Sequence, residues 1–127
     1  MSGKLILLID DDPLSNIFNT MMIKKNHPGE EVLAITNAND AINYLKDDNR
    51  KVPELIFLDL NMPIMNGWDF LEEYKKLDLK INIVLVTSSN DSDDISRSKG
   101  YKEVKHYLVK PITSDSLKKA VALMDIP

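Results

Sequence analysis

Residues 5–13 run Leu5-Ile6-Leu7-Leu8-Ile9-Asp10-Asp11-Asp12-Pro13, so five apolar residues are followed at once by three acids and a proline. An apolar run that does not alternate with polar residues is typical of a strand covered on both faces of a parallel sheet. An Asp followed by Pro is typical of a helix N-cap and the first helical position. This stretch therefore predicts a buried strand, an acidic turn and a helix that begins at Pro13.

The same alternation of strand and helix continues along the whole chain. Further short runs of apolar and β-branched residues predict strands at 32–36, 55–58, 83–87 and 107–109. Between them lie stretches of helical length with apolar residues at helical spacing, and we expect these residues to face the core: Ile17, Met21, Met22 and Ile23, then Trp68, Phe70, Leu71, Tyr74 and Leu77. The pattern predicts an α/β fold with five βα units, in which helices cover both faces of a parallel sheet.

Helix start signals agree with this interpretation. Asn37 or Asn39 can cap the second helix, Asn66 the third and Thr113 the fifth. Each helix is therefore expected to begin just after a strand ends.

Length and composition exclude several classes of protein. The 127 residues fit one domain spanning 1–127, because compact domains cluster near about 100–150 residues. The formal charge of −4, from 16 Lys and Arg against 20 Asp and Glu, argues against nucleic acid as the main partner. The chain has no Cys, and no stretch reaches the about 18 apolar residues of a membrane span. We therefore expect a cytoplasmic protein without a membrane anchor.

Acidic residues follow two of the predicted strands. Asp10 and Asp11 come after the first strand and Asp59 after the third. If these strands are neighbours, three carboxylates converge at the sheet edge where ligands bind in open α/β folds. Such a cluster needs a cation, and a site of oxygen ligands alone favours Mg²⁺. An Asp at a strand end is more often a cap or turn residue, and Asp12 is assigned that role.

Two further strand ends carry groups that suit phosphate. Thr87 ends the fourth strand and Lys110 follows the fifth. A hydroxyl can donate a hydrogen bond to a phosphoryl oxygen, and an ammonium group can neutralise one. Because a carboxylate can act as a nucleophile and form an acyl phosphate, the set predicts Mg²⁺-assisted phosphoryl transfer.

The motifs together resemble the receiver domain of two-component response regulators, and the resemblance covers essentially the whole chain. It rests on these four segments: Leu7-Leu8-Ile9-Asp10-Asp11-Asp12-Pro13, Leu58-Asp59-Leu60-Asn61-Met62-Pro63-Ile64-Met65-Asn66-Gly67, Val86-Thr87-Ser88-Ser89 and Tyr107-Leu108-Val109-Lys110-Pro111. The resemblance implies a flavodoxin-like sheet of strand order 2-1-3-4-5. It also implies phosphorelay signalling by a stand-alone receiver.

The resemblance assigns roles to the acidic residues. Asp59 would accept a phosphoryl group from a histidine kinase, a phosphotransfer protein or a small phosphodonor. Asp11 would bind Mg²⁺ directly, Asp10 largely through water, and Asn61 through its backbone carbonyl. The domain would assist its own phosphorylation and dephosphorylation without being an enzyme with a separate substrate.

The resemblance also implies a switch. Lys110 would pair with the phosphoryl group and with Asp59, and the Lys110–Pro111 peptide would be cis. On phosphorylation Thr87 would move toward the phosphoryl group and Tyr107 would turn inward. The surface of the fourth helix, fifth strand and fifth helix, residues 91–124, would then control a partner protein, because the chain leaves no segment for direct DNA binding.

Two features depart from or refine the family pattern. The segment 101–109, between Gly100 and Lys110, has more residues than is usual in the family, which predicts a small insertion before the fifth strand. Ser89 and Asn61 occupy positions that tune dephosphorylation in the family.

Three alternatives stay open. The chain could be a receiver excised from a longer regulator or hybrid kinase. An aspartate-nucleophile phosphatase of the haloacid dehalogenase type would need an acid two residues after its nucleophile, where Asn61 follows Asp59. A flavodoxin-like cofactor module would need a phosphate-binding loop where Asp10 and Asp11 stand, and these acids would repel an anionic cofactor.

Overall fold

The computed structural model describes residues 4–88 and 92–125, in which strands and helices alternate. The strands are β1 (Leu5–Ile9), β2 (Glu31–Ile35), β3 (Leu55–Asp59), β4 (Asn82–Thr87) and β5 (Val104–Val109). The helices are α1 (Pro13–Asn26), α2 (Ala38–Lys46), α3 (Gly67–Tyr74), α4 (Ser92–Ser98) and α5 (Ser114–Val121), with a 3-10 turn at Ala122–Asp125. In these two ranges no helix is both long and apolar enough to cross a lipid bilayer.

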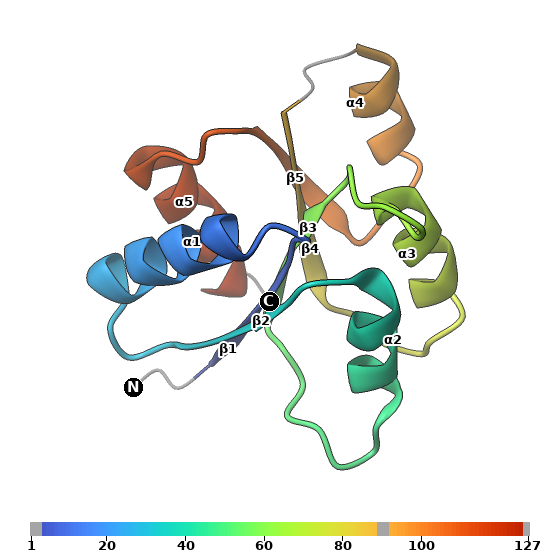
Figure 1. Cartoon of the computed structure of the whole chain (residues 1–127), viewed down its shortest axis with the longest axis horizontal. Coiled ribbons are helices and arrows are strands. Elements are labelled where there is room, and N and C mark those ends of the chain that lie inside the picture. The colour runs from blue at the N-terminus through green and yellow to red at the C-terminus, as the bar shows by residue number, and fades with distance from the viewer. Residues whose placement is uncertain (1–3, 89–91, 126–127) are drawn as a thin grey trace.

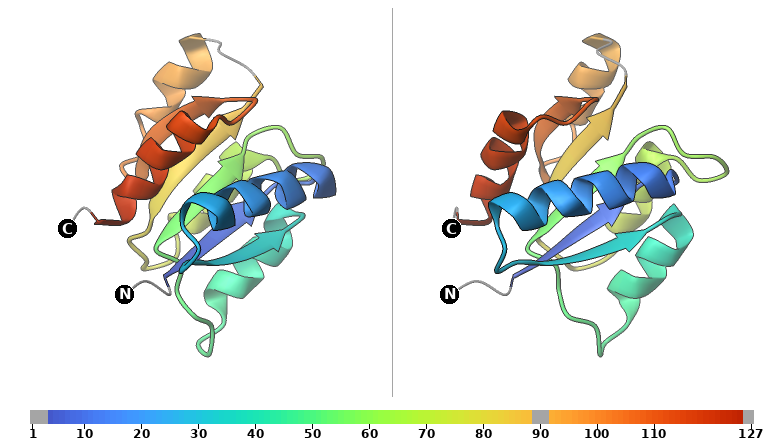
Figure 2. Two further views of the ribbon diagram at one scale, coloured as in Figure 1. Left: turned by 90° about the vertical axis from the view of Figure 1, so that its left-hand side faces the viewer. Right: turned by 60° about the vertical axis from the view of Figure 1, so that its left-hand side comes forward.

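All five strands are parallel and form one sheet in the order β2-β1-β3-β4-β5. Helices α1 and α5 lie on one face of this sheet, and α2, α3 and α4 lie on the other (Figure 1). Two further views show the twist of the sheet between these layers (Figure 2). The predicted three-layer α/β fold and strand order are thus confirmed.

The core has two halves, one on each face of the sheet. Alternate residues of each buried strand point to opposite faces, so Leu7 and Ile9 pack with α2 and α3, whereas Ile6 and Leu8 pack with α1 and α5. On α3, the predicted core residues are buried, and Leu77 just after it is partly buried. On α1 the prediction is half wrong, because Ile17 is 56% exposed and Met21 66% exposed.

The helix caps follow the predicted residues. Asp12 accepts a hydrogen bond from the Leu14 N–H, and Asn37 rather than Asn39 caps α2. Asn66 and Thr113 form reciprocal capping boxes with the residue three positions on. Local side-chain hydrogen bonds therefore set where these helices begin.

Strand β5 is longer than the sequence suggests. It begins at Val104 rather than Tyr107. Val104 pairs with Ile83 and His106 with Val84, so Lys105 is an extra residue that the register shift absorbs. The expected insertion before the strand is therefore wrong in position, since the added residues extend the strand and form a bulge.

Aromatic and charged side chains join α3 to α4 and the turn after it. The Arg97 guanidinium lies 4.4 Å from the centre of the Trp68 ring. The Tyr101 ring stacks on Trp68 with centroids 5.9 Å apart, and its hydroxyl donates to Glu72 at 2.6 Å. We call Trp68, Arg97, Tyr101 and Glu72 the α3–α4 brace. Trp68 is a packing residue, as predicted.

Candidate functional site

Three carboxylates meet at the carboxyl ends of β1 and β3. The two strands are hydrogen-bonded neighbours with Ile9 opposite Leu58, which brings Asp10 and Asp11 beside Asp59. One carboxylate oxygen from each of the three acids lies within 4.8 Å of the others. Asp10 and Asp59 are buried, whereas Asp11 is exposed. The convergence expected from the sequence is therefore present.

Burial makes Asp59 an unusual carboxyl group. Loss of solvent raises the pKa of Asp59 from 3.8 to about 6, and the charge of Asp10 adds to this. The Asn61 N–H, which donates to Asp59 Oδ1 at 3.1 Å, and the Lys110 ammonium lower the pKa in part. The cluster is thus short of positive charge.

Lys110 supplies the one cation that reaches the buried acids among the described residues. Its ammonium lies 3.0 Å from Asp10 Oδ2 and 3.6 Å from Asp59 Oδ2. Burial lowers the pKa of Lys110, but the hydrogen bond to Asp10 and the charge of Asp59 outweigh this and raise it. The Lys110–Pro111 peptide is cis, as expected, although Lys110 pairs more closely with Asp10 than with Asp59.

Thr87 and Asn61 are joined by a side-chain contact that sequence reasoning missed. The Asn61 amide Nδ2 donates to Thr87 Oγ1 at 2.9 Å, and Thr87 is fully buried at the end of β4. The sequence feature that could have predicted this contact is the Asn at position 61, because an amide two residues after Asp59 can reach the end of the neighbouring strand. The backbone N–H of Asn61 thus contacts the predicted phosphoacceptor while its side chain contacts the predicted switch residue.

A glycine lets α3 begin close to the acidic site. A Cβ on Gly67 would lie 2.8 Å from Leu60 Cα and 2.9 Å from the Asp59 carbonyl oxygen. The Gly67 N–H donates to the Leu60 carbonyl at 3.0 Å. The intervening loop places Ile64 at φ 68° and leaves it fully exposed.

The remaining predicted residues are less defined by the geometry. Tyr107 is partly buried against the core half that includes α2 and α3, so its proposed inward turn stays a prediction. Ser89 and Asp91 lie outside the described residues.

The donor set suits a hard divalent cation. It consists of carboxylate oxygens from two strand ends, with no nitrogen or sulfur ligand in the described cluster. Mg²⁺ prefers such oxygen ligands and keeps several waters, and the exposed Asp11 leaves one side of the cluster open to solvent. The residues therefore fit the cation that the sequence implied.

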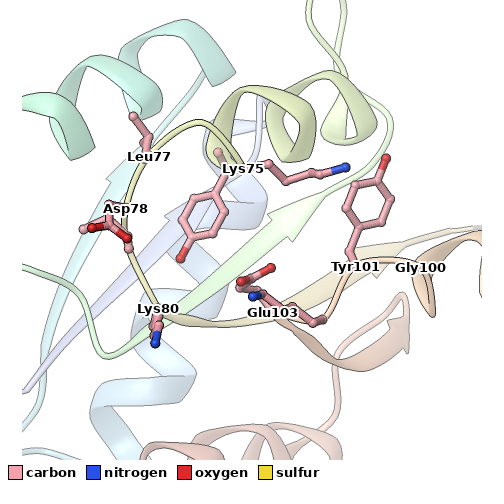
Figure 3. A pocket seen from close by; sticks show the side chains of 10 residues that line it. Lys75, Leu77, Asp78, Lys80, Gly100, Tyr101 and Glu103 are labelled. Carbon is pink, nitrogen blue, oxygen red and sulfur yellow. The ribbon is translucent and has the colours of Figure 1, made fainter.

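A separate pocket lies at the amino ends of β4 and β5 and has different chemistry (Figure 3). It measures about 400 Å³ between the loop before β4 and the turn before β5. Lysines and acids share its rim, as Lys80, Asp78 and Glu103 show in Figure 3. It has none of the grouped carboxylates that mark the first site.

Comparison with known proteins settles the family. A model of the response regulator receiver domain matches residues 6–122. The chain belongs to the receiver domain family. The receiver is 31% identical to a two-component response regulator from Cytophaga hutchinsonii, whose crystal structure aligns over 100% of both chains with a TM-score of 0.91.

Two further relatives extend the comparison. The receiver is 32% identical over 116 residues to the probable C4-dicarboxylate response regulator DctR of Halalkalibacterium halodurans. That match covers 91% of this chain and 49% of DctR, so the chain spans about half the length of this curated relative. A Mn²⁺-bound form of response regulator Rcp1 is 27% identical, with 97% of this chain and 93% of that one covered and a TM-score of 0.79.

Family membership carries the general function. The receiver takes part in phosphorelay signalling, in which receiver domains accept phosphoryl groups from histidine kinases. Receiver domains bind Mg²⁺ at an acidic pocket, and they are generally signal transducers and not enzymes. The phosphatase alternative is not favoured.

Proposed function

We propose that the protein is a phosphorelay receiver in which Asp59 is the phosphoacceptor. The observation that carries the proposal is the meeting of three carboxylates with Lys110 and Thr87 at one sheet edge. The response regulator from Cytophaga hutchinsonii, which aligns over 100% of both chains, supports the receiver function of this chain. The cytoplasmic location stays a prediction.

The proposed reaction is transfer between a histidine and an aspartate. An Asp59 carboxylate oxygen bonds to phosphorus while the P–N bond of the donor's phosphohistidine breaks, and the released imidazole takes up a proton. Asn61 N–H holds the other carboxylate oxygen, which orients the nucleophile. Lys110 can neutralise charge on the transferred group.

We assign the metal to the three acids and the Asn61 carbonyl. Asp11 and Asp59 would bind Mg²⁺ directly, and Asp10, which already accepts from Lys110 and the Asp12 N–H, largely through water. The bound cation supplies positive charge against the phosphoryl oxygens. The manganese-bound form of Rcp1, a relative of similar fold, supports a divalent ion in this type of domain.

Helix α1 offers a surface for the phosphodonor. Its residues at positions 14, 17, 18 and 21 share one face and are all more than half exposed: Leu14 74%, Ile17 56%, Phe18 56% and Met21 66%. We call them the α1 apolar stripe. A groove of about 500 Å³ runs beside it toward Lys110 and Pro111. A stripe of this kind fits an apolar helix of a histidine kinase or phosphotransfer protein.

The output surface is proposed on α4, β5 and α5. A phosphoryl group on Asp59 adds negative charge and acceptor oxygens near Thr87. The Thr87 hydroxyl accepts a hydrogen bond from Asn61 Nδ2, and on phosphorylation it would move to donate its own proton to one of these oxygens. The movement, with Tyr107, would change the surface that a downstream protein binds, and no direct DNA contact is proposed.

Intact mass after incubation with Mg²⁺ and acetyl phosphate tests the proposal. We expect one phosphoryl group on the wild type, and none on Asp59→Asn or after Mg²⁺ is removed by chelation. Lys110→Ala, which retains Asp59, should be labelled much less than the wild type. Labelling of Asp59→Asn to the wild-type extent would assign the acceptor to another residue.

A further inference from the structure

Asn16 is a buried polar residue of α1, only 4% exposed, close to the end of β1. Its amide Nδ2 donates to the Asp10 carbonyl at 2.9 Å. This bond ties the first turns of the helix to the strand end that carries the acidic pair. Asn16 therefore supports the site from below without being one of its predicted ligands.

The other half of this carboxamide has no partner. Asn16 Oδ1 is buried and accepts no hydrogen bond from any group within residues 4–88 and 92–125. Exchanging the amide atoms would not help, because it would set an oxygen against the Asp10 carbonyl oxygen. A buried acceptor without a donor is energetically unfavourable, so a donor is expected at this atom.

A small cavity is lined both by Asn16 and by two acids of the acidic site. It is lined by Asn16, Asn19, Asp10 and Asp59 together with apolar side chains of the core. It leaves about 10 Å³ for the centre of a water molecule, which is close to the smallest space that holds one water. Ionised carboxylates only accept hydrogen bonds, as does Asn16 Oδ1. A water molecule, which is neutral and can donate two hydrogen bonds, therefore suits the cavity.

We infer that Asn16 holds one water molecule in this cavity and is thereby a positioning residue of the phosphoryl site. The water donates one proton to Asn16 Oδ1 and the other to the Asp10–Asp59 carboxylate pair. It links α1 to the two buried metal-binding acids and limits their rotation. The inference rests on the proposed function for its consequence, and on Asn16 and the cavity for the water itself.

Loss of this water-mediated link should weaken the affinity of the site for Mg²⁺. Removing a group that holds metal ligands in position changes metal affinity or activity about 10–100-fold. Asn16→Leu keeps a similar volume and deletes both polar atoms, so we expect it to weaken Mg²⁺ binding about tenfold. Asn16→Ser keeps a hydroxyl and leaves room for water, so its affinity should stay within about threefold of the wild type.

The test combines a high-resolution crystal structure of the wild type with Mg²⁺ titrations followed by the Asn61 and Gly67 amide NMR signals. Asn26→Leu is the matched control, because Asn26 lies on the same helix and donates to the Met22 carbonyl, away from the site. A merely structural role would lower the unfolding free energy of Asn16→Leu and leave Mg²⁺ affinity unchanged. The expected result is an ordered water on Asn16 Oδ1 and weaker Mg²⁺ binding by Asn16→Leu alone.

Two results would overturn the inference: a dry cavity in the wild-type crystal, or equal Mg²⁺ affinity of Asn16→Leu and the wild type. If Asn16→Leu does not fold, the wild-type crystal structure still decides whether a water binds Asn16 Oδ1. Failure of acetyl phosphate to label wild-type Asp59 would overturn the proposed function and leave the water site standing.

Discussion

At the scale of single residues, Asp59 lies in an environment that disfavours its ionised form. It is buried beside Asp10, and the Asn61 N–H and Lys110 only partly offset the loss of solvent. The pKa of about 6 means that the folded protein binds a proton more readily than the unfolded chain, whose Asp59 has its ordinary value of 3.8. Folding is therefore opposed by ionisation of Asp59.

Asp59→Asn should stabilise the metal-free protein at neutral pH. Because the folded pKa is raised, the penalty is absent below about pH 4, grows as pH rises through about 6, and is complete at pH 7. After allowance for solvent screening we expect a gain of about 1–2 kcal/mol at pH 7. Urea unfolding in a chelator at pH 4 and pH 7 measures it, and an equal gain at both pH values would contradict this origin.

Mg²⁺ should narrow the difference in stability between Asp59→Asn and the wild type. The cation offsets the repulsion among the three carboxylates of the wild type, whereas Asp59→Asn has lost one charged ligand. Repeating the pH 7 unfolding in saturating Mg²⁺ should therefore stabilise the wild type more than the variant. If Mg²⁺ raises the unfolding free energy of Asp59→Asn as much as that of the wild type, the cation binds elsewhere.

At the scale of elements, the junction of β3 with α3 depends on close backbone approach. Gly67→Ala would place a methyl group 2.8 Å from Leu60 Cα, and the helix or the end of β3 must move. We expect a loss of about 1–3 kcal/mol in unfolding free energy and slower labelling of Asp59 by acetyl phosphate. Gly100→Ala is the control, since its nearest atom, the Arg97 carbonyl oxygen, would be 3.4 Å away.

Helix α4 depends on the α3–α4 brace. Among the residues of α4, Ser92–Ser98, only Ser98 is buried, so the contact of Arg97 with Trp68 is a main attachment of this helix. Arg97→Gln should lose about 0.5–1 kcal/mol of this contact and speed amide exchange in α4 several-fold. Tyr101→Phe, which removes the hydrogen bond to Glu72, should act in the same direction.

Hydrogen exchange by NMR and Trp68 fluorescence follow this change. Lys99→Gln removes a positive charge next to α4 and should leave both signals unchanged. Unaltered exchange in Arg97→Gln would show that α4 is held by other contacts.

At the scale of the whole molecule, the two faces of α1 divide packing from recognition. Ile23 and Asn16 face the sheet, whereas the α1 apolar stripe faces outward beside Lys110 and Pro111. Changing two members of the stripe, Phe18→Ser with Met21→Ser, should therefore slow phosphotransfer from a phosphorylated histidine kinase about tenfold. Labelling by acetyl phosphate should not change, because that donor needs no helix contact.

Folding stability separates recognition from damage in this experiment. Exposed substitutions usually change the unfolding free energy by no more than about 0.5 kcal/mol. Lys25→Ser, on the same helix and also exposed, is the matched control and should accept phosphate from the kinase at the wild-type rate. Equal slowing with acetyl phosphate would mean that the stripe supports the site and not the donor.

The sequence by itself was enough for the architecture and for most of the site. Unbroken apolar runs such as Leu5–Ile9 reveal buried parallel strands, and caps such as Asp12 and Asn66 act through local hydrogen bonds that depend on near neighbours in the chain. Asp10, Asp11 and Asp59 could be placed together because the carboxyl ends of parallel strands share one edge.

Only the tertiary structure decided which side chains meet across elements. The bond from Asn61 to Thr87, and the closer approach of Lys110 to Asp10 at 3.0 Å than to Asp59 at 3.6 Å, depend on how separate strand ends are placed relative to one another. Periodicity placed Ile17 and Met21 in the core, yet the helix leaves them exposed, because apolar spacing marks a face without saying whether the protein or a partner covers it. Long-range packing settles such questions, and no local pattern records it.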